Sequence, residues 1–133
     1  MASVQDAVDP VAAVLLLQER VNADAFLVHR GRFLDANFLL EIGDVPFIVS
    51  IERGRIVNVE RGPFTMRPWD FAVRGTQLGW SRFWQRMPPP QFHDVFALMK
   101  RKELRIEGNL HTFMTHLPYL KEVLAAPRAR LES

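Results

Sequence analysis

The stretch FLDANFLLEIGDVPFIVSIERGRIVNVE, residues 33–60, decides the fold. It divides into three strand-like runs at 33–42, 46–52 and 55–60. Gly43 and Gly54 stand between these runs, where two tight hairpins are the natural connections. Because successive side chains of a strand point to opposite faces, alternation places apolar residues together on one face. That face is predicted to carry Phe38, Leu40, Ile42, Phe47, Val49 and Ile51.

A fourth strand-like run follows at 69–75. Alternation puts Trp69, Phe71 and Val73 on one side, while Asp70 and its alternate neighbours point the other way. Together with the two hairpins, this run predicts a four-stranded antiparallel meander with one strongly apolar face. Such a face needs a layer of helices to cover it.

Before and after these strands, apolar residues no longer recur at every second position but at the spacing of a helix. A first helix is predicted from Asp9 to Arg20, with Asp9 as N-cap and Pro10 in its first turn. Its end is open: Asn22-Ala23-Asp24 could stop it, or Phe26, Leu27 and Val28 could extend it towards Gly31 or begin a strand. Two amphipathic helices separated by Pro88-Pro89-Pro90 are predicted after the fourth strand, because apolar residues recur at i, i+3, i+4 and i+7. Their apolar faces carry Trp80, Phe83, Trp84 and Met87, then Phe92, Val95, Phe96 and Met99.

A short fifth strand is predicted from Glu103 to Glu107, closed by Gly108. Asn109 is a good N-cap for a last helix, which Pro118 should kink. The fold class is therefore α+β, in the order α-β-β-β-β-α-α-β-α. We expect a five-stranded, mainly antiparallel sheet backed by helices in one domain spanning 1–133, with flexible ends at 1–8 and 126–133.

Composition narrows the class of protein. The chain has 133 residues, of which 48% are hydrophobic and 24% charged, as in a globular domain. No apolar run is long enough for a membrane span and no signal peptide is recognisable, so a cytoplasmic location is expected. The absence of cysteine excludes disulfides and thiolate metal sites. A net charge of +2 gives no indication of nucleic acid as a partner.

Three short motifs resemble the sterol carrier protein (sterol carrier protein 2-like) family. They are Ile-Glu-Arg-Gly-Arg-Ile-Val at 51–57, Trp-Asp-Phe-Ala-Val-Arg-Gly at 69–75 and Leu-Arg-Ile-Glu-Gly-Asn at 104–109. Gly54, Asp70 and Gly108 match structural positions of that family, and the order of elements over roughly 35–125 agrees. The resemblance implies a sheet and helices around an apolar tunnel that accepts sterols, fatty acids, acyl-coenzyme A or other lipids, without catalytic residues or a cofactor.

The aromatic residues of the second half are the candidate ligand-binding residues. The expected tunnel lining is Phe71, Trp80, Phe83, Trp84, Phe96, Phe113 and Met114. Trp80, Trp84, Phe92 and Phe96 could instead fill the tunnel, because aromatic residues at helical spacing are ordinarily core. The alternative function is then that of a filled-core accessory or interaction domain for a partner enzyme.

Basic residues accompany these aromatic residues. Between 80 and 105 six basic residues stand against two acidic ones. Arg82 and Arg86 are the candidates to hold an anionic head group or to contact an anionic membrane surface transiently. An ordinary solvated helix face is the alternative for both. A homodimer is left open.

Catalytic and metal-binding patterns are absent from the sequence. The histidines at 29, 93, 111 and 116 form no i, i+4 pair, and no glycine motif for phosphate occurs. Metal and cofactor binding are therefore not expected. A weaker third hypothesis is an enzyme that uses Asp70, as a buried carboxylate, together with a histidine. The prediction is that the chain is not an enzyme.

Overall fold

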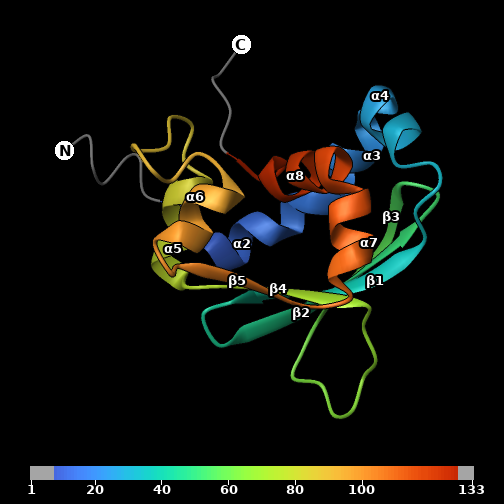
Figure 1. The fold of residues 1–133 in the computed structure, drawn as a ribbon, viewed down its shortest axis with the longest axis horizontal. Coiled ribbons are helices and arrows are strands. Elements are labelled where there is room, and N and C mark those ends of the chain that lie inside the picture. Colours follow the sequence, from blue (N-terminus) through green and yellow to red (C-terminus); the bar gives the residue numbers. More distant parts are fainter. Residues whose placement is uncertain (1–7, 129–133) are drawn as a thin grey trace.

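A computed structural model describes residues 8–128, so most of the two ends expected to be flexible lies outside the described residues. A layer of helices covers one face of a single five-stranded sheet (Figure 1). The helical elements are α2 (Pro10–Ala13), the 3₁₀ turn η1 (Val14–Leu16), α3 (Leu17–Ala23), α4 (Ala25–Arg30), α5 (Gln77–Phe83), α6 (Val95–Lys100), α7 (Leu110–Thr115) and α8 (Leu117–Ala125). The strands are β1 (Ala36–Ile42), β2 (Val45–Glu52), β3 (Arg55–Arg61), β4 (Phe71–Gly75) and β5 (Leu104–Gly108).

The predicted five strands and the two hairpins are confirmed, but the predicted meander is wrong. The strand order is β3-β2-β1-β4-β5, so β4 lies beside β1, not beside β3. β1 and β4 pair in parallel and the other three pairs are antiparallel, which makes the sheet mixed. The segment between β3 and β4 forms the long loop on the face of the sheet away from the helices (Figure 1).

The prediction that Trp69 lies on the same face as Phe71 and Val73 is wrong, and this connection explains why. Trp69 precedes β4 and packs with Phe64 on the outer face of the sheet, against Leu39, Ile48 and Ala72. Phe71 lies on the helix-covered face, where it is fully buried. The outer face therefore has an apolar patch of its own, and the crossing loop supplies its cover. Alternation along the strands accounts for both faces, because neighbouring residues point to opposite sides.

The first predicted helix begins as expected, but it is not continuous. The Asp9 carboxylate accepts a hydrogen bond from the Val11 backbone N–H at 3.1 Å, which confirms the N-cap. A 3₁₀ turn then interrupts the helix and rotates its faces, so that Leu15 is 76% exposed while Val14 and Leu17 are fully buried. The helix ends at Ala23, because Asp24 has an extended conformation and caps a separate helix, α4, that ends at Gly31. Of the two ends that the sequence left open, the earlier one is therefore correct.

The two helices after β4 are shorter than predicted. α5 ends at Phe83, so Met87 lies outside it and is 77% exposed, contrary to the predicted apolar face. α6 begins only at Val95, and its buried side chains are Val95 and Leu98, while Phe96 points outward. Pro88-Pro89-Pro90 lie between the two helices, and Asp94 caps the start of α6 by accepting a hydrogen bond from the Phe96 N–H at 3.2 Å.

The last strand and helix agree with the sequence in position. Gly108 adopts a φ of 93°, a conformation open to glycine, at the end of β5. Asn109 caps α7 by accepting a hydrogen bond from the Thr112 N–H at 3.1 Å, as predicted. Instead of a kink, the helix breaks at His116, and Pro118 occupies the first turn of α8.

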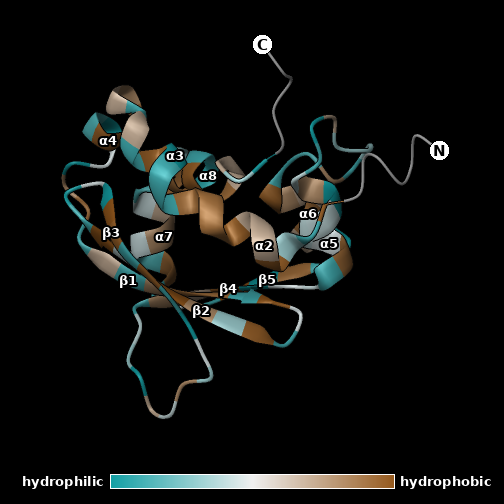
Figure 2. Cartoon of the chain, turned by 180° about the vertical axis from the view of Figure 1, so that it is seen from behind, coloured by the Kyte–Doolittle hydropathy of each residue, from teal (hydrophilic) through white to brown (hydrophobic). Residues whose placement is uncertain are grey.

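Buried apolar residues of the helices and of the sheet form the main core. Figure 2 shows the hydropathy of each residue along the two layers. The six residues predicted for the apolar sheet face are all buried in this core: Phe38, Leu40, Ile42, Phe47, Val49 and Ile51. None of the described helices is long and apolar enough to cross a membrane.

Candidate functional site

Most of the predicted tunnel-lining residues meet in one buried cluster between the sheet and the helices. Phe71 from β4, Phe113 from α7 and three aromatic residues around α5 are each at most 2% exposed. The Trp80 and Trp84 rings stack with centroids 4.7 Å apart, and Phe83 meets Trp80 edge to face at 5.8 Å. These distances are typical of aromatic pairs in a packed core.

Hydrogen bonds fix both tryptophans in this cluster. The Trp80 indole N–H donates to the Glu41 carbonyl oxygen at 2.9 Å, which ties α5 to β1. The Trp84 indole N–H donates to the Leu124 carbonyl oxygen at 2.7 Å, which ties the end of α5 to α8. Among the described residues, no buried side-chain nitrogen or oxygen lacks a partner. The two tryptophans therefore join three elements of the fold and cannot rotate without breaking these bonds.

The other four predicted site residues do not join the cluster. Phe96 is 38% exposed and Met114 is 53% exposed. The Arg82 guanidinium lies over the Phe92 ring, 5.1 Å from its centroid, and Arg86 is exposed. The aromatic and basic residues that the sequence grouped by proximity along the chain are thus divided between the core and the surface.

A cleft of about 420 Å³ opens between the first helical segment, which comprises α2, η1 and the start of α3, and the β2–β3 part of the sheet. Its walls are formed by Val11, Ala12, Val14, Leu15, Phe47 and Val59, and its mouth by Asp9, Gln18 and Arg61. The volume falls within the range of about 300–1,000 Å³ that is typical of small-molecule sites. Val14 and Phe47 also belong to the main core, so the inner wall of the cleft is the edge of that core.

Sequence reasoning did not find this cleft. Alternation identified Phe47 as a core residue, and helical spacing identified Val14, but their meeting depends on the 3₁₀ turn that rotates the first helix. At the mouth, Asp9 uses its carboxylate to cap α2. Arg61 is exposed and makes no ion pair or hydrogen bond through its side chain within residues 8–128. At the mouth, Arg61 is therefore a cation without an ion-pair partner among residues 8–128, next to apolar walls.

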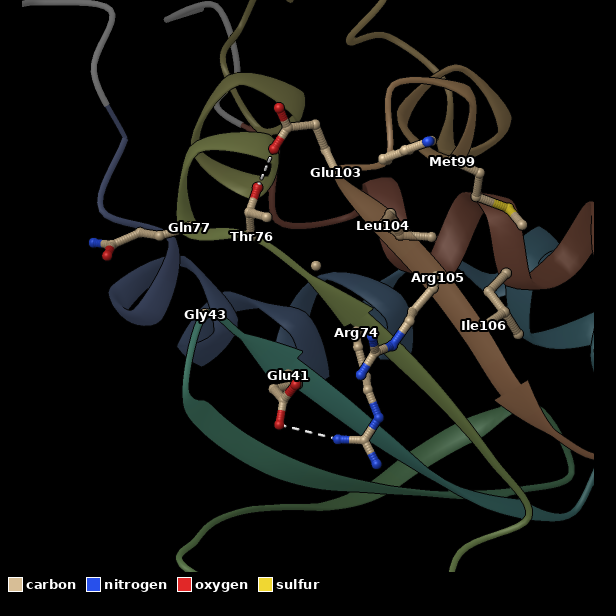
Figure 3. A pocket seen from close by; sticks show the side chains of 12 residues that line it. Glu41, Gly43, Arg74, Thr76, Gln77, Met99, Glu103, Leu104, Arg105 and Ile106 are labelled. Carbon is tan, nitrogen blue, oxygen red and sulfur yellow. Dashed lines mark hydrogen bonds and ion pairs between the residues drawn. The ribbon is translucent and has the colours of Figure 1, made fainter.

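A second cavity, of about 700 Å³, lies beside the ends of β4 and β5 and is shown in Figure 3. Arg74 and Glu41 line it, and Arg74 donates to Glu41 at 3.0 Å and, outside the lining, to Glu107 at 2.8 Å. The hydrogen bond from Arg74 is the main reason why the pKa of Glu107 is lowered. Opposite, the Thr76 hydroxyl donates to Glu103 at 2.5 Å. Because these groups are already paired, this cavity suits an apolar ligand less well than the cleft does.

The residues considered for catalysis have structural partners or surface positions. Asp70 is exposed, and its carboxylate accepts a hydrogen bond from the Asn37 backbone N–H at 2.8 Å, which fixes the start of β1. The weaker hypothesis of a buried catalytic carboxylate at Asp70 is therefore wrong. In the described part of the chain, no three histidine, aspartate or glutamate side chains are grouped so that they could hold a metal ion.

The sequence matches no protein-family model, and no curated protein is similar to it in sequence. Solved structures do match. Sterol carrier protein 2 superimposes with a TM-score of 0.68 and 12% identity, over 90% of this chain and 96% of that one. Palmitated sterol carrier protein 2-like 2 from Aedes aegypti matches with a TM-score of 0.55 and 17% identity, over 96% and 99% of the two chains.

A third match is part of a larger protein. The sec-alkylsulfatase Pisa1 from Pseudomonas sp. matches with a TM-score of 0.55 and 13% identity, over 88% of this chain but only 16% of the sulfatase. A unit of this shape therefore occurs both as nearly a whole chain and as a small part of an enzyme. At these identities the likeness establishes the fold alone: the chain has the fold of sterol carrier protein 2.

Proposed function

We propose that the protein binds an apolar ligand between its helices and its sheet, without catalysis of its own, and carries it between partners. The ligand class is a sterol, fatty acid, acyl-coenzyme A or other lipid. The observation that carries this proposal is the apolar cleft between the first helical segment and the sheet, in a fold shared with a palmitated protein. Apolar walls with few polar groups at the mouth are typical of lipid sites.

In this proposal the cleft is the entrance, and the aromatic cluster is the inner boundary of the site. Val14 and Phe47 would contact the ligand first. Deeper entry, towards Phe71 and Phe113, requires the first helical segment to move away from the sheet. The 3₁₀ turn at 14–16 is the natural place for this movement, because such turns within helices are weaker than α-helix and often act as hinges.

Contact with an anionic membrane is part of the same proposal. Leu78 is 47% exposed on α5 and Met87 is 77% exposed just after it. Arg82 and Arg86 lie between them in the sequence. Exposed apolar side chains next to arginines can dock on an anionic surface, where the rings and chains enter the interface and the cations meet head groups.

A filled-core accessory domain is the second candidate. The stacked, hydrogen-bonded Trp80 and Trp84 favour it, because they occupy the centre of the interior. Under this function the protein would act on a partner enzyme through its surface. The two candidates differ in a simple measurement, since only the first requires a lipid to bind to the isolated chain.

The test combines lipid extraction with a binding assay. Purified protein is denatured, extracted and analysed by mass spectrometry, and delipidated protein is titrated with a fluorescent stearate and with dehydroergosterol. Val59→Trp fills the cleft, whereas Val57→Trp places the same side chain on the same strand at a position that is 46% exposed and outside the cleft. We expect Val59→Trp to weaken binding at least about tenfold and Val57→Trp to leave it unchanged.

The results of this test distinguish a lipid-binding protein from an accessory domain, and the cleft from another entrance. A folded protein that contains no lipid and binds neither probe would contradict the proposed function and favour the accessory domain. Binding that survives Val59→Trp, in a variant whose thermal melt is unchanged, would contradict the cleft as the entrance.

A further inference from the structure

The two outer edges of the sheet differ in whether their backbone groups are covered. At the β3 edge, the Asn22 side chain from α3 accepts a hydrogen bond from the Ile56 N–H at 2.9 Å and donates to the Ile56 carbonyl oxygen at 2.8 Å. At this one residue of β3, the side chain occupies the place of a neighbouring strand. Such cover is a common way to keep an edge strand from pairing with another chain.

The β5 edge has no such cover. Thr76 N–H donates to the Glu103 carbonyl oxygen at 2.9 Å and Asn109 N–H donates to the Asp70 carbonyl oxygen at 2.8 Å, so the odd-numbered residues of this segment face β4. Because backbone groups alternate along an antiparallel strand, the N–H and C=O groups of the even-numbered residues point away from β4. These residues are Leu104, Ile106 and Gly108, and no hydrogen bond to their outward groups exists within residues 8–128.

The space beside this edge is open. Leu104, Arg105 and Ile106 line the 700 Å³ cavity, together with Met99 from α6 (Figure 3). The free backbone groups therefore adjoin a cavity and not a packed element. Leu104 is 4% exposed, whereas Ile106 is half-buried and Gly108 is exposed, so the accessible part of this edge is the end of β5. An edge strand that is both unpaired and accessible is a template for a further strand.

The charges on β5 indicate which strand would fit. We propose that a second copy of this chain pairs with β5 antiparallel, about a twofold axis that passes through Ile106. This register places Ile106 opposite its own copy, where the two residues exchange backbone hydrogen bonds, and places Gly108 beside the buried Leu104 of the other copy. It also places Arg105 opposite Glu107 of the partner copy, twice by symmetry.

This complementarity is a property of the observed β5 strand. Arg105 and Glu107 lie on the same face of the strand, where they already form an ion pair of 2.8 Å within one copy. In the proposed dimer each Arg105 gains a second carboxylate directly across the strand pair, a stabilising arrangement. The same register would bring α6 of one copy towards α7 of the other, whose Leu110 and Met114 are more than half exposed.

The dimer is expected to be weak. Pairing five residues at an edge buries less than the roughly 1,200 Å² of a standard interface, so association is expected at concentrations of about 10 µM to 1 mM. Sedimentation equilibrium across this range should give masses rising from one chain towards two. A mass of one chain throughout would overturn the proposal.

Cysteine cross-linking tests the axis, and the native chain contains no cysteine to interfere. Opposed residues of a hydrogen-bonded pair have Cα atoms about 5.5 Å apart, within the range of about 4.4–6.8 Å that a disulfide spans. Ile106→Cys should therefore give a covalent dimer under mild oxidation or with a short bismaleimide. Val57→Cys, on β3 next to Ile56 that Asn22 covers, is the matched control. Equal cross-linking of both variants, or none with Ile106→Cys, would overturn the proposed axis.

Charge reversal tests the register. Arg105→Glu sets like charges opposite each other at two symmetric places, and should weaken self-association at least about tenfold. The Arg105 side chain is 69% exposed, so its loss should not unfold the monomer. Glu107 also pairs with Arg74 at 2.8 Å and is therefore left unchanged. Arg105→Gln removes the charge without reversing it and should weaken association less than Arg105→Glu does. Self-association that is the same in all three proteins would contradict this interface, whereas a larger loss for Arg105→Glu than for Arg105→Gln would support it.

Discussion

Replacement of Asn22 offers the sharpest test of how the sheet is held under its helices. Its amide makes two hydrogen bonds with Ile56, of 2.9 and 2.8 Å, in a partly buried position between α3 and β3. A hydrogen bond within a protein contributes about 1 kcal/mol net. Asn22→Ala should thus lower the free energy of unfolding by about 2 kcal/mol. For a domain of this size that corresponds to a fall in melting temperature of about 6–10 °C.

The protein contains its own probe for this measurement. Trp80 and Trp84 are fully buried, so unfolding in urea should change the tryptophan fluorescence strongly. Asn58→Ala is the matched control, because Asn58 is exposed on the same strand as Ile56 and its side chain makes no hydrogen bond in residues 8–128. The control should stay within about 0.5 kcal/mol of the native chain. If Asn22→Ala does so too, the idea that Asn22 substitutes for a neighbouring strand is refuted.

Two further predictions concern single groups. Tyr119→Phe removes the hydrogen bond of 2.6 Å from the buried hydroxyl to the Gly54 carbonyl oxygen, so urea titration should show a loss of about 1–3 kcal/mol, and a loss below about 0.5 kcal/mol would contradict this. Glu107 has a pKa below its usual 4.5, chiefly because Arg74 donates a hydrogen bond to it. The folded state therefore binds protons less readily than the unfolded chain. The ionised Glu107 side chain therefore contributes to stability above pH 4.5, and this contribution is lost as the pH falls below that value. Glu107→Gln should flatten stability against pH between about 5 and 3, and an unchanged slope would argue against it.

Local patterns in the sequence predicted the strands and their faces well, and the pairing of distant strands poorly. Gly43, Gly54 and the alternation around them predict β1 to β3 because hairpins depend on neighbouring residues. The place of β4 depends instead on where Phe64 and Trp69 find apolar surface, and that surface is the outer face of β1 and β2. No local pattern distinguishes such a crossing loop from a third hairpin.

The same limit applies to the candidate site. Helical spacing predicted correctly that Trp80, Phe83 and Trp84 are buried, because a stripe on one side of a helix faces the core. It failed for Met87, where the helix had already ended. The cleft was missed because its walls come from two segments that no motif links, and because a 3₁₀ turn sets the orientation of one of them.

Burial alone does not separate a side chain that lines a lipid tunnel from one that fills it, but the bonds of the tryptophans do bear on where a ligand can enter. Movement of α5 would break the bond of Trp80 to β1 and that of Trp84 to α8, each worth about 1 kcal/mol net, and would expose two large rings. α2 and η1 have fewer ties: just before them the Ser81 hydroxyl donates to the Val8 carbonyl oxygen at 2.7 Å, and the Val14 side chain packs in the core. α3, by contrast, is held by hydrogen bonds of the Arg20 and Asn22 side chains. A ligand that enters between the layers should therefore displace α2 and its 3₁₀ turn before it displaces α5.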